Sequence, residues 1–586
     1  MSVSASSDRS KPSESANPVS KLDLITSLGR FQSVSAEKLR GGFYTPGIVT
    51  EWLCHWAISS SGDQVLEPSC GDGQFLVSAV RRLIELGASP LDLERQITGV
   101  EVNPEEAQKA MARILVDGVS QPQNVVRTTD FFAWHAKSPE NKSFDAVVGN
   151  PPFIRYQNFP PKSRDRAMSL LGNAGLKPNK LTNIWVPFVV ACIDLLKPGG
   201  RLAMVIPAEL LQVTYAGQLR RYLTEAFEKT TIISCNELFF KDAEQEVLLL
   251  LASGRRKHIS ADVEGKVGLV QKKTLESIVG SDSSSLIKTV EFKSVCNDSE
   301  KWLKYFLSNS DIEFMRELRQ SSVATSMAQF GSVEVGVVTG KNRWFVVDEA
   351  TVQEFDLEEY VRPAIGRSVH LQGAILDSPD WAALSESGAK VHLLDFSLRP
   401  DGKINEGLRR YITMAEQKHW HQGYKCRIRE PWYQVPSLWV PDGFVFRQIY
   451  DFPKMSLNRS RAIPTDTIHR LRVDGCEPAD LIASAYTYLT GASAEIEGRS
   501  YGGGVLELEP SEARRLLVPS KLQLALPVEQ IDQSLKQKKL DAVLEENSHL
   551  VLREGLGLST GEIRKLKAIW TQLRERRNTR RGVSSN

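Results

Sequence analysis

The sequence predicts an α/β protein, with a parallel sheet of the nucleotide-binding type in its first half and a mixed α/β region in its second half. A glycine-rich turn joins an apolar run to a helical pattern within residues 64–85, and further apolar runs follow at 96–102, 125–129 and 144–149. Each run ends in polar or glycine residues. Because ligands of open α/β sheets lie outside the carboxyl ends of the strands, these ends form the expected site.

The first unit is a short strand over Gln64–Leu66, the turn Glu67-Pro68-Ser69-Cys70-Gly71-Asp72-Gly73, and a helix that runs to about Glu85. Glycines let a ligand approach the backbone, and the start of the helix favours an anionic group such as a carboxylate. A Gly-x-Gly pattern alone is weak evidence for a ligand. Cys70 is expected to be a small packing residue, since no histidine stands near it in the sequence.

Two acids follow at the ends of the next two strands. Glu101 comes about 20 to 30 residues after the glycines, where such folds place an acid on ribose hydroxyls. Asp130 ends the third strand. Either acid alone could instead cap the helix that follows it. The order of glycine turn, acid and aspartate favours the ligand interpretation.

The fourth strand, Phe144–Gly149, ends in Asn150-Pro151-Pro152-Phe153. Proline fixes its own φ and holds the residue before it extended, so the carbonyl groups of Asn150 and Pro151 have nearly set directions. The Asn150 side-chain oxygen and the Pro151 main-chain oxygen can accept the two hydrogens of an exocyclic amine, and Phe153 can stack on a flat molecule. The motif indicates methyl transfer to nitrogen. In isolation it could also be a proline-rich turn that closes a strand.

Three more segments complete the pattern. The first is Gly42-Phe43-Tyr44-Thr45-Pro46, and the second is residues 195–207, which read as a helix end, a turn and a fifth strand. The third is residues 238–243, which precede a strand at Val247–Leu251. Thr45 is a candidate N-cap, with Pro46 as the first helical residue. Over about residues 36–255 the order of motifs resembles the gamma class of S-adenosylmethionine-dependent DNA adenine-N6 methyltransferases of restriction-modification systems. The resemblance implies a Rossmann-like methyltransferase domain followed by a mixed α/β DNA target-recognition domain.

The resemblance also implies the site residues. The cofactor-binding residues would be Tyr44, Thr45, Glu67, Pro68, Gly71, Gly73, Glu101, Asp130 and Asn150. Within this set Glu101 would take the ribose hydroxyls, and Asp130 the amino group of the cofactor's adenine. Glu67 is a departure, because many relatives carry aspartate at that position.

The catalytic residues implied by the resemblance are Asn150, Pro151, Pro152 and Phe153, and we expect no metal. Phe153 and Phe239 would stack on the target base, with Phe240 as the alternative to Phe239. The expected reaction is a direct in-line displacement, in which positioning and electrostatics do most of the work. The target adenine would be flipped out of the duplex into the pocket.

Length and composition are compatible with these expectations. A chain of 586 residues with 41% hydrophobic residues can form more than one domain, and its net charge of +2 leaves any basic surface local. Seven scattered cysteines without a Cys-x-x-Cys pair argue against a disulfide scaffold and a structural zinc site. The polar N-terminus and the absence of long apolar runs predict an intracellular, soluble protein without a membrane segment. The resemblance implies that it is prokaryotic, cytoplasmic and DNA-associated.

We expect four regions: a disordered polar arm over residues 1–35, a catalytic domain over 36–265, a target-recognition domain over 266–525, and a helical basic segment over 526–586. Residues 333–347 are expected to form two strands around a turn.

Several later segments mix cations with aromatic rings: 419–421, 424–433 and 458–461. Such segments suit DNA contacts, but they are also common on solvated surfaces. The arginines at 574, 576, 577, 580 and 581 could contact the DNA backbone or belong to a fraying end.

Double-stranded DNA is the expected partner, with a restriction endonuclease acting separately and a monomer as the active form. One alternative acceptor is an RNA base or a protein glutamine, because Asn-Pro-Pro-aromatic also suits planar amides. Another alternative is a bifunctional nuclease and methyltransferase, or an inactive binding subunit. Glu264-Gly265-Lys266 has the Glu-x-Lys spacing of some nucleases but no clear upstream aspartate in a strand.

Overall fold

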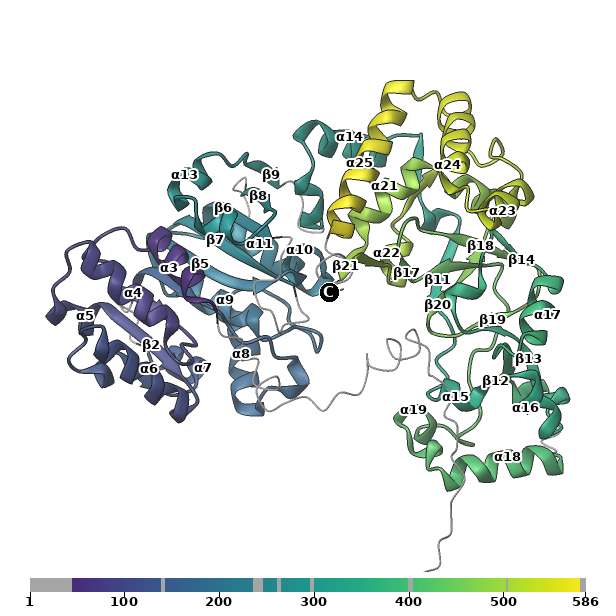
Figure 1. Ribbon diagram of the computed structural model, residues 1–586, viewed down its shortest axis with the longest axis horizontal. Helices are drawn as coiled ribbons and strands as arrows, with labels where there is room; N and C mark the ends of the chain where they lie inside the picture. The colour runs from purple at the N-terminus through teal and green to yellow at the C-terminus, as the bar shows by residue number, and fades with distance from the viewer. Residues whose placement is uncertain are drawn as a thin grey trace, which may run out of the picture.

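The computed structural model describes residues 45–138, 143–235, 246–260, 265–295, 300–398, 404–501 and 504–579. Figure 1 shows two lobes. The strands β1 to β9 form the first lobe, and the elements from β10 onward form the second.

The first lobe contains one nine-stranded sheet with the order β3-β2-β1-β4-β5-β7-β6-β8-β9. Its strands are β1 (Val65–Glu67), β2 (Ile97–Glu101), β3 (Val126–Thr128), β4 (Phe144–Gly149), β5 (Leu196–Pro207), β6 (Phe227–Cys235), β7 (Val247–Arg255), β8 (Gly265–Lys272) and β9 (Lys293–Val295). The strands from β3 to β5 in this order are parallel, and β7 runs antiparallel to both of its neighbours. The predicted α/β fold with a nucleotide-type parallel sheet is therefore confirmed, as are the four predicted strands that lead to the site.

Helices cover both faces of this sheet. They are α3 (Gly47–Ala57), α4 (Gln74–Glu85), α5 (Pro90–Gln96), α6 (Pro104–Val116), α7 (Phe131–His135), α8 (Pro161–Asn173), α9 (Trp185–Asp194), α10 (Glu209–Gln212), α11 (Gly217–Ala226), α12 (Glu276–Val279) and α13 (Ser283–Lys288). Ala146 and Val148 of β4 join the core under α3, α4 and α6, whereas Val147 joins the core under α7, α8 and α9. Because both faces are buried, the strand is apolar from Ala146 to Gly149, which makes it recognisable in the sequence.

Among its described residues, the second lobe contains four smaller sheets with the orders β11-β20-β16-β18-β14, β12-β15-β13-β19, β17-β22-β21 and β10-β23. Its strands are β10 (Ala324–Ser326), β11 (Gly331–Val335), β12 (Val346–Val347), β13 (Val361–Ile365), β14 (Ile375–Leu376), β15 (His392–Leu394), β16 (Gly443–Phe446), β17 (Gln448–Ile449), β18 (Met455–Asn458), β19 (Ile463–Pro464), β20 (Ile468–Val473), β21 (Arg499–Tyr501), β22 (Val505–Glu507) and β23 (Leu517–Pro519).

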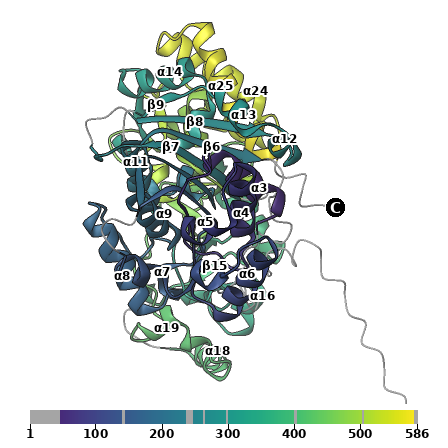
Figure 2. The same cartoon turned by 90° about the vertical axis from the view of Figure 1, so that its left-hand side faces the viewer.

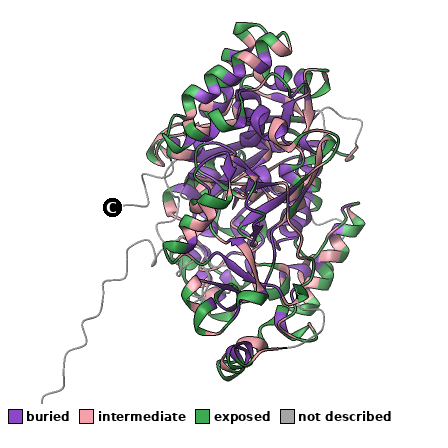
Figure 3. Ribbon diagram, turned by 90° about the vertical axis from the view of Figure 1, so that its right-hand side faces the viewer, coloured by how far each residue is buried: buried purple, intermediate pink, exposed green. Residues whose placement is uncertain are grey.

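The helices of the second lobe are α14 (Asn309–Gln320), α15 (Asn342–Phe345), α16 (Glu349–Glu354), α17 (Ser378–Glu386), α18 (Glu406–Gln417), α19 (Tyr424–Arg427), α20 (Pro478–Ala485), α21 (Tyr488–Glu497), α22 (Pro510–Ala513), α23 (Val528–Lys536), α24 (Leu540–Ser548) and α25 (Thr560–Asn578). One apolar cluster runs from Leu66 in the first lobe, through Trp302 and Tyr305, to Trp570 in α25. Figure 3 shows buried residues on the strands and the inward helix faces of this side. The two lobes therefore share a continuous core.

The prediction of two strands within residues 333–347 is wrong in its second half. The chain leaves β11, forms the helical turn α15, and enters the two-residue strand β12 of a different sheet. Gly340 has a φ of +87°, and the Lys341 N–H donates to the Thr339 hydroxyl oxygen at 3.1 Å. These turn contacts start a helix in a segment whose β-branched and aromatic composition favours a strand.

The expected basic tail is also different from the prediction. Arg577 is 1% exposed, and its guanidinium donates to both carboxylate oxygens of Glu495 and to the Gly504 carbonyl oxygen. Arg576 is buried over the Phe306 ring. Neither arginine is a solvated DNA contact, because both pack against the body of the protein. Arg580 and Arg581 lie outside the described residues.

Within the part of the chain that the structure describes, no helix has both the length and the apolar character needed to cross a membrane.

Candidate active site

The carboxyl ends of β1, β2 and β4 meet at one edge of the sheet. The strand β1 lies between β2 and β4 and is parallel to both. A Cβ atom on Gly149, the last residue of β4, would lie 3.3 Å from Pro68 Cδ and 3.7 Å from Glu67 Cγ. Glu67, Pro68 and the start of the Asn150 motif are therefore in close contact, as the sequence order predicts.

The turn between β1 and α4 requires glycine. Gly71 and Gly73 have φ values of +52° and +90°. A Cβ atom on Gly73 would lie 2.8 Å from both Cα and Cβ of Ala110 in α6. Only glycine combines this backbone conformation with such a close approach. The turn thus holds the N-terminus of α4 against α6.

Glu67 is the most unusual acid of the site. It is 2% exposed, and its Oε2 atom has no hydrogen-bond partner among the described residues. Burial raises the pKa of its carboxyl well above the usual value, and the charges of Asp72 and Glu101 raise it further. A buried acceptor without a partner is costly, so the geometry favours a ligand that brings a donor or a positive charge.

Glu101 is held in place by the backbone of two neighbouring turns. Its carboxylate accepts hydrogen bonds from the Gly71 N–H at 2.9 Å and from the Asn103 N–H at 2.8 Å. Burial raises its pKa. Asn103, not Glu101, caps α6. The capping alternative is therefore wrong for Glu101, and its carboxylate faces the glycine turn.

Asp130 caps α7, as the alternative interpretation had it. Its Oδ1 atom accepts a hydrogen bond from the Ala133 N–H at 2.8 Å, and Arg166 Nη1 lies 3.9 Å from the same oxygen. Capping uses Oδ1, so it does not by itself exclude a ligand contact through Oδ2.

Asn150 contacts segments from two other parts of the chain. Its Nδ2 atom donates a hydrogen bond to Thr45 Oγ1 at 3.3 Å. The Ser69 hydroxyl donates to the Asn150 main-chain oxygen at 3.2 Å. Both the side chain and the backbone of the motif's first residue are thus positioned by the surrounding turns.

Thr45 differs in one respect from the prediction. Helix α3 begins at Gly47 and its N-cap is Pro46, without a side-chain capping hydrogen bond. Thr45 is therefore one residue outside the cap and is not the N-cap. Its buried hydroxyl accepts from Asn150 instead. Tyr44 lies outside the described residues.

Phe153 is half-buried and packs against the apolar cores on both faces of the sheet. The loop after it is anchored by the Ile184 N–H, which donates to the Ile154 carbonyl oxygen at 3.0 Å. Phe239 and Phe240 lie outside the described residues, so their expected stacking stays a prediction.

Two residues of the site were not predicted. Ser69 fixes the Asn150 backbone, and Asp72 forms an ion pair with Arg113 at 2.8 Å while burial raises its pKa. Both residues lie within the glycine turn, and this position is the sequence feature from which their role at the site could have been predicted. Cys70 is buried, and burial raises the pKa of its thiol, as expected for a packing residue. No cluster of three potential metal ligands occurs within the described ranges.

A large cavity of the first lobe lies away from these strand ends. Its volume is about 940 Å³, and it is lined by residues of α7, α8, α9 and α11, among them His135, Arg166 and Tyr222. None of the predicted site residues lines it. The size of this cavity does not by itself indicate a reaction, so the strand ends remain the candidate active site.

The second lobe carries two groups of cations stacked on tryptophan. Lys341, Arg343 and Lys418 lie 5.6, 5.5 and 5.1 Å from the ring centre of Trp420. Arg470 and Arg472 lie 4.5 and 4.3 Å from that of Trp439.

A cavity of about 330 Å³ is lined by Arg470 of the second group, together with Lys425 and Arg429. In Figure 1, α15 and α19 lie on the side of the second lobe that is turned toward the first lobe. Figure 2 shows α19 at the same end of the molecule as α8.

Comparisons with known proteins cover nearly the whole described chain. Residues 27–305 match the family model described as N-6 DNA Methylase. Residues 299–552 match the model described as Type II methyltransferase M.Eco57I, C-terminal domain.

Among the relatives, the Type II methyltransferase M.AccI of Acinetobacter calcoaceticus is 22% identical over 500 residues, which are 83% of this chain and 86% of that protein. The Type II methyltransferase M.XhoI of Xanthomonas vasicola is 24% identical over 421 residues, which are 65% and 72% of the two chains.

Among solved structures, the type IIG restriction endonuclease BpuSI aligns with a TM-score of 0.38 and 14% identity over 92% of this chain and 65% of that one. The DrdV–DNA complex aligns with a TM-score of 0.44 and 14% identity over 77% and 50% of the two chains. The chain thus spans about two thirds or less of these solved chains.

Proposed function

We propose that this chain is an N6-adenine DNA methyltransferase of the restriction-modification type, which transfers a methyl group from S-adenosylmethionine to the N6 amine of adenine in duplex DNA. The family matches confirm the resemblance found in the sequence. The observation that carries the proposal for the site is the contact between Asn150 and Thr45 at the carboxyl edge of the sheet.

The residues present fit the proposed cofactor. S-adenosylmethionine offers an ammonium group, ribose hydroxyls and an adenine amine, all of which donate hydrogen bonds. The unpartnered, buried Oε2 of Glu67 is an acceptor of this kind, and the cluster of Glu67, Asp72 and Glu101 suits a cationic ligand. Glu67, Glu101 and Asp130 would hold these donors, with Thr45 and Gly71 beside them. When bound, the cofactor supplies a methyl group activated on a sulfonium.

Asn150 and Pro151 would orient the acceptor amine. The hydrogen bond from Asn150 Nδ2 to Thr45 fixes the side that the amide nitrogen faces, so that Oδ1 points away from Thr45. From there Oδ1 and the Pro151 carbonyl oxygen accept the two amine hydrogens, which favours a pyramidal nitrogen with an accessible lone pair. No strong base is needed, because the nitrogen becomes acidic only as it gains the methyl group. Phe153, with Phe239 as its expected partner, would replace the stacking that the flipped base loses.

The second lobe would bind the duplex. The cations held over Trp420, and the exposed Arg472 over Trp439, are suited to phosphate contacts, and the rings limit the positions that these cations can adopt. The match of residues 299–552 to a Type II methyltransferase domain supports DNA over an RNA base or a protein glutamine as the substrate.

The proposal includes a single chain as the active unit, a separate restriction endonuclease as its functional partner, and the prokaryotic cytoplasm as its place of action. A nuclease centre at Glu264-Gly265-Lys266 is not part of it, and Glu264 lies outside the described residues.

Purified protein incubated with labelled S-adenosylmethionine and plasmid DNA should produce N6-methyladenine at a defined sequence. RNA and protein extracts serve as competing acceptors, and label found only in one of these would refute the DNA proposal. Asn150→Ala should lower kcat by about 10² to 10³, because it removes an oriented acceptor at the reacting atom, and should leave cofactor binding largely intact. Wild-type turnover in this variant would show that Asn150 has another role.

A further inference from the structure

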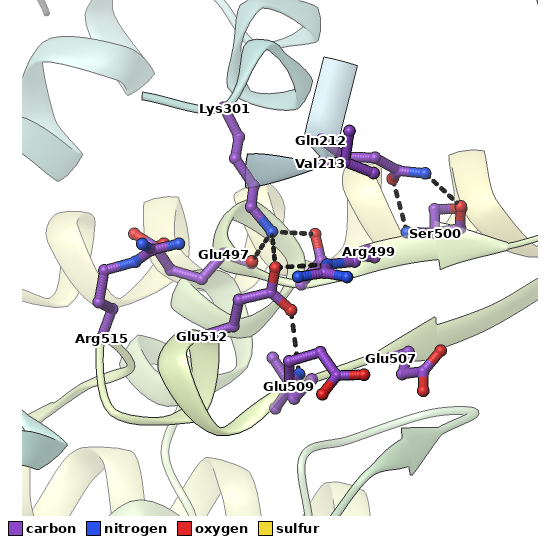
Figure 4. Close-up of polar contacts among 12 residues, drawn as sticks. Gln212, Val213, Lys301, Glu497, Arg499, Ser500, Glu507, Glu509, Glu512 and Arg515 are labelled. Atoms are coloured by element: carbon purple, nitrogen blue, oxygen red, sulfur yellow. Dashed lines mark hydrogen bonds and ion pairs between the residues drawn. The ribbon is translucent and has the colours of Figure 1, made fainter. Parts of the chain in front are cut away.

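A side chain of the first lobe forms a two-point hydrogen-bond pair with a strand of the second lobe. Gln212 Nε2, at the end of α10, donates to the Ser500 carbonyl oxygen at 2.6 Å, and its Oε1 accepts from the Ser500 N–H at 2.7 Å (Figure 4). Gln212 is 5% exposed and Ser500, in β21, is 6% exposed. The carboxamide thus satisfies both backbone groups of a buried strand residue.

The covalent connection between the lobes reaches the same strand. Lys301, on the segment that leads from the first sheet into the second lobe, forms an ion pair with Glu512 at 2.6 Å and also donates to the Gly498 carbonyl oxygen at 3.2 Å. Glu512 accepts from Arg499, the neighbour of Ser500, at 2.7 Å. Figure 4 shows these groups converging on the strand β21.

The strand β5 connects the Gln212 contact to the candidate active site. Gly149, the residue before Asn150, is paired with Met204 of β5. The strand β5 ends at Pro207, and α10 spans Glu209–Gln212. The helix α10 thus directly follows the strand that borders the Asn150 motif.

Apolar contacts and hydrogen bonds constrain this junction differently. The shared core around Trp302 and Tyr305 holds the lobes together, but apolar burial is not directional and tolerates small sliding movements. A two-point pair between a carboxamide and a backbone has one geometry, because both donor–acceptor lines must be satisfied together.

We propose that Gln212 is a positioning residue that fixes the second lobe relative to Asn150. This junction sets the distance between the recognised bases and the adenine that is methylated, so that adenines at other distances are not methylated. The proposal rests on the proposed DNA methylation. Gln212 touches neither cofactor nor substrate in it, and acts through β21.

Gln212→Ala tests the proposal, with Gln218→Ala as a matched control. Gln218 makes the same kind of two-point pair, with the Lys177 N–H at 2.6 Å and the Lys177 carbonyl oxygen at 3.1 Å, but within the first lobe. Gln212→Ala should lower kcat on plasmid DNA by about 10- to 100-fold. It should raise the fraction of methyl groups at adenines outside the recognised sequence and leave the Kd for S-adenosylmethionine unchanged. Gln218→Ala should retain both kcat and site selectivity.

Gln212→Asn is the second variant, because it keeps the amide but is one methylene too short to satisfy both groups of Ser500. It should fall between wild type and Gln212→Ala in selectivity. Unchanged kcat and selectivity in both Gln212 variants would overturn the proposal, and so would a loss of cofactor binding in parallel with kcat, since that indicates a general structural role. If the unaltered protein transfers no methyl group to DNA, the proposed function itself fails, and this inference fails with it.

Discussion

The amide nitrogen of Asn150 lies 3.3 Å from the hydroxyl oxygen of Thr45, a residue 105 positions earlier in the chain. Thr45 precedes the helix α3, and Asn150 follows the strand β4. A buried hydroxyl thus determines which way the carboxamide of the motif faces. Because amide nitrogen and oxygen occupy opposite sides of the group, this contact directs the oxygen that the proposed mechanism needs.

Thr45→Val is expected to lower kcat by about 5-fold, the equivalent of a net hydrogen bond of about 1 kcal/mol. The hydroxyl that orients the Asn150 amide is lost, while the volume of the side chain is kept. Steady-state methylation of plasmid DNA measures the effect. Thr45→Ser retains the hydroxyl and should behave as wild type. A defect in Thr45→Ser together with wild-type turnover in Thr45→Val would show that the threonine methyl group, not the hydrogen bond, matters.

Glu67→Gln is expected to stabilise the ligand-free protein at neutral pH and to weaken cofactor binding. Burial and the charges of Asp72 and Glu101 raise the pKa of Glu67 well above its usual value of 4.5. The folded protein therefore binds this proton more tightly than the unfolded chain, so the free energy of unfolding contributed by Glu67 falls as the pH rises above about 4.5.

Thermal unfolding between pH 5 and 8 should show a higher Tm for Glu67→Gln, with the difference increasing toward pH 8. The exposed Glu105 of α6 provides the control variant Glu105→Gln, which should show no such trend. A Tm for Glu67→Gln that stays at or below wild type throughout would contradict the electrostatic explanation. Calorimetric titration with S-adenosylmethionine measures the expected loss of affinity.

Arg343→Ala is expected to raise the KM for plasmid DNA and to reduce its salt dependence. Arg343 is one of the three cations around Trp420 that we assign to the duplex-binding surface. Loss of one phosphate contact should lower the slope of log K against log salt by about 1. Lys539, an exposed residue before α24, gives the control Lys539→Ala. Equal salt slopes for Arg343→Ala and wild type would remove this residue from the DNA surface.

Arg577→Ala is expected to destabilise the protein by about 3 to 5 kcal/mol, because it leaves Glu495 buried without its partner. Arg577 and Glu495 have side chains that are 1% and 4% exposed. Chemical denaturation measures the change in the free energy of unfolding. The double variant Arg577→Leu with Glu495→Leu should recover most of the stability. If Arg577→Ala instead kept wild-type stability and lost DNA affinity, Arg577 would be a DNA contact after all.

Much of the fold around the site was predictable because local pattern and tertiary environment agree there. The strand β4 is buried on both faces from Ala146 onward, so it forms an apolar run that ends at the edge of the sheet where the ligand is expected. Gly73 was recognisable because the turn needs a backbone conformation that other residues rarely adopt.

The wrong predictions have a common physical cause. The segment around Trp344 has the composition of a strand, yet turn contacts at Thr339 and Gly340 make it helical. The ring centres of Trp344 and Tyr411 are 5.3 Å apart, so the two rings pack together. Arg577 has the composition of a solvated tail, yet it pairs with Glu495. In the first case a local turn and packing against a residue 67 positions away override the composition, and in the second case pairing with a residue 82 positions away does so.

The sequence by itself determined the order of the chemical groups at the strand ends, since a glycine turn, two acids and Asn150-Pro151-Pro152-Phe153 are local features of the chain. Only the tertiary structure decided which way Asn150 faces, that Glu67 has a buried oxygen without a described partner, and that Gln212 is paired with β21. The contacts of Asn150 with Thr45 and of Gln212 with Ser500 join residues 105 and 288 positions apart. Their geometry follows from how the sheet, the helices and the two lobes pack together, which no local pattern of residues encodes.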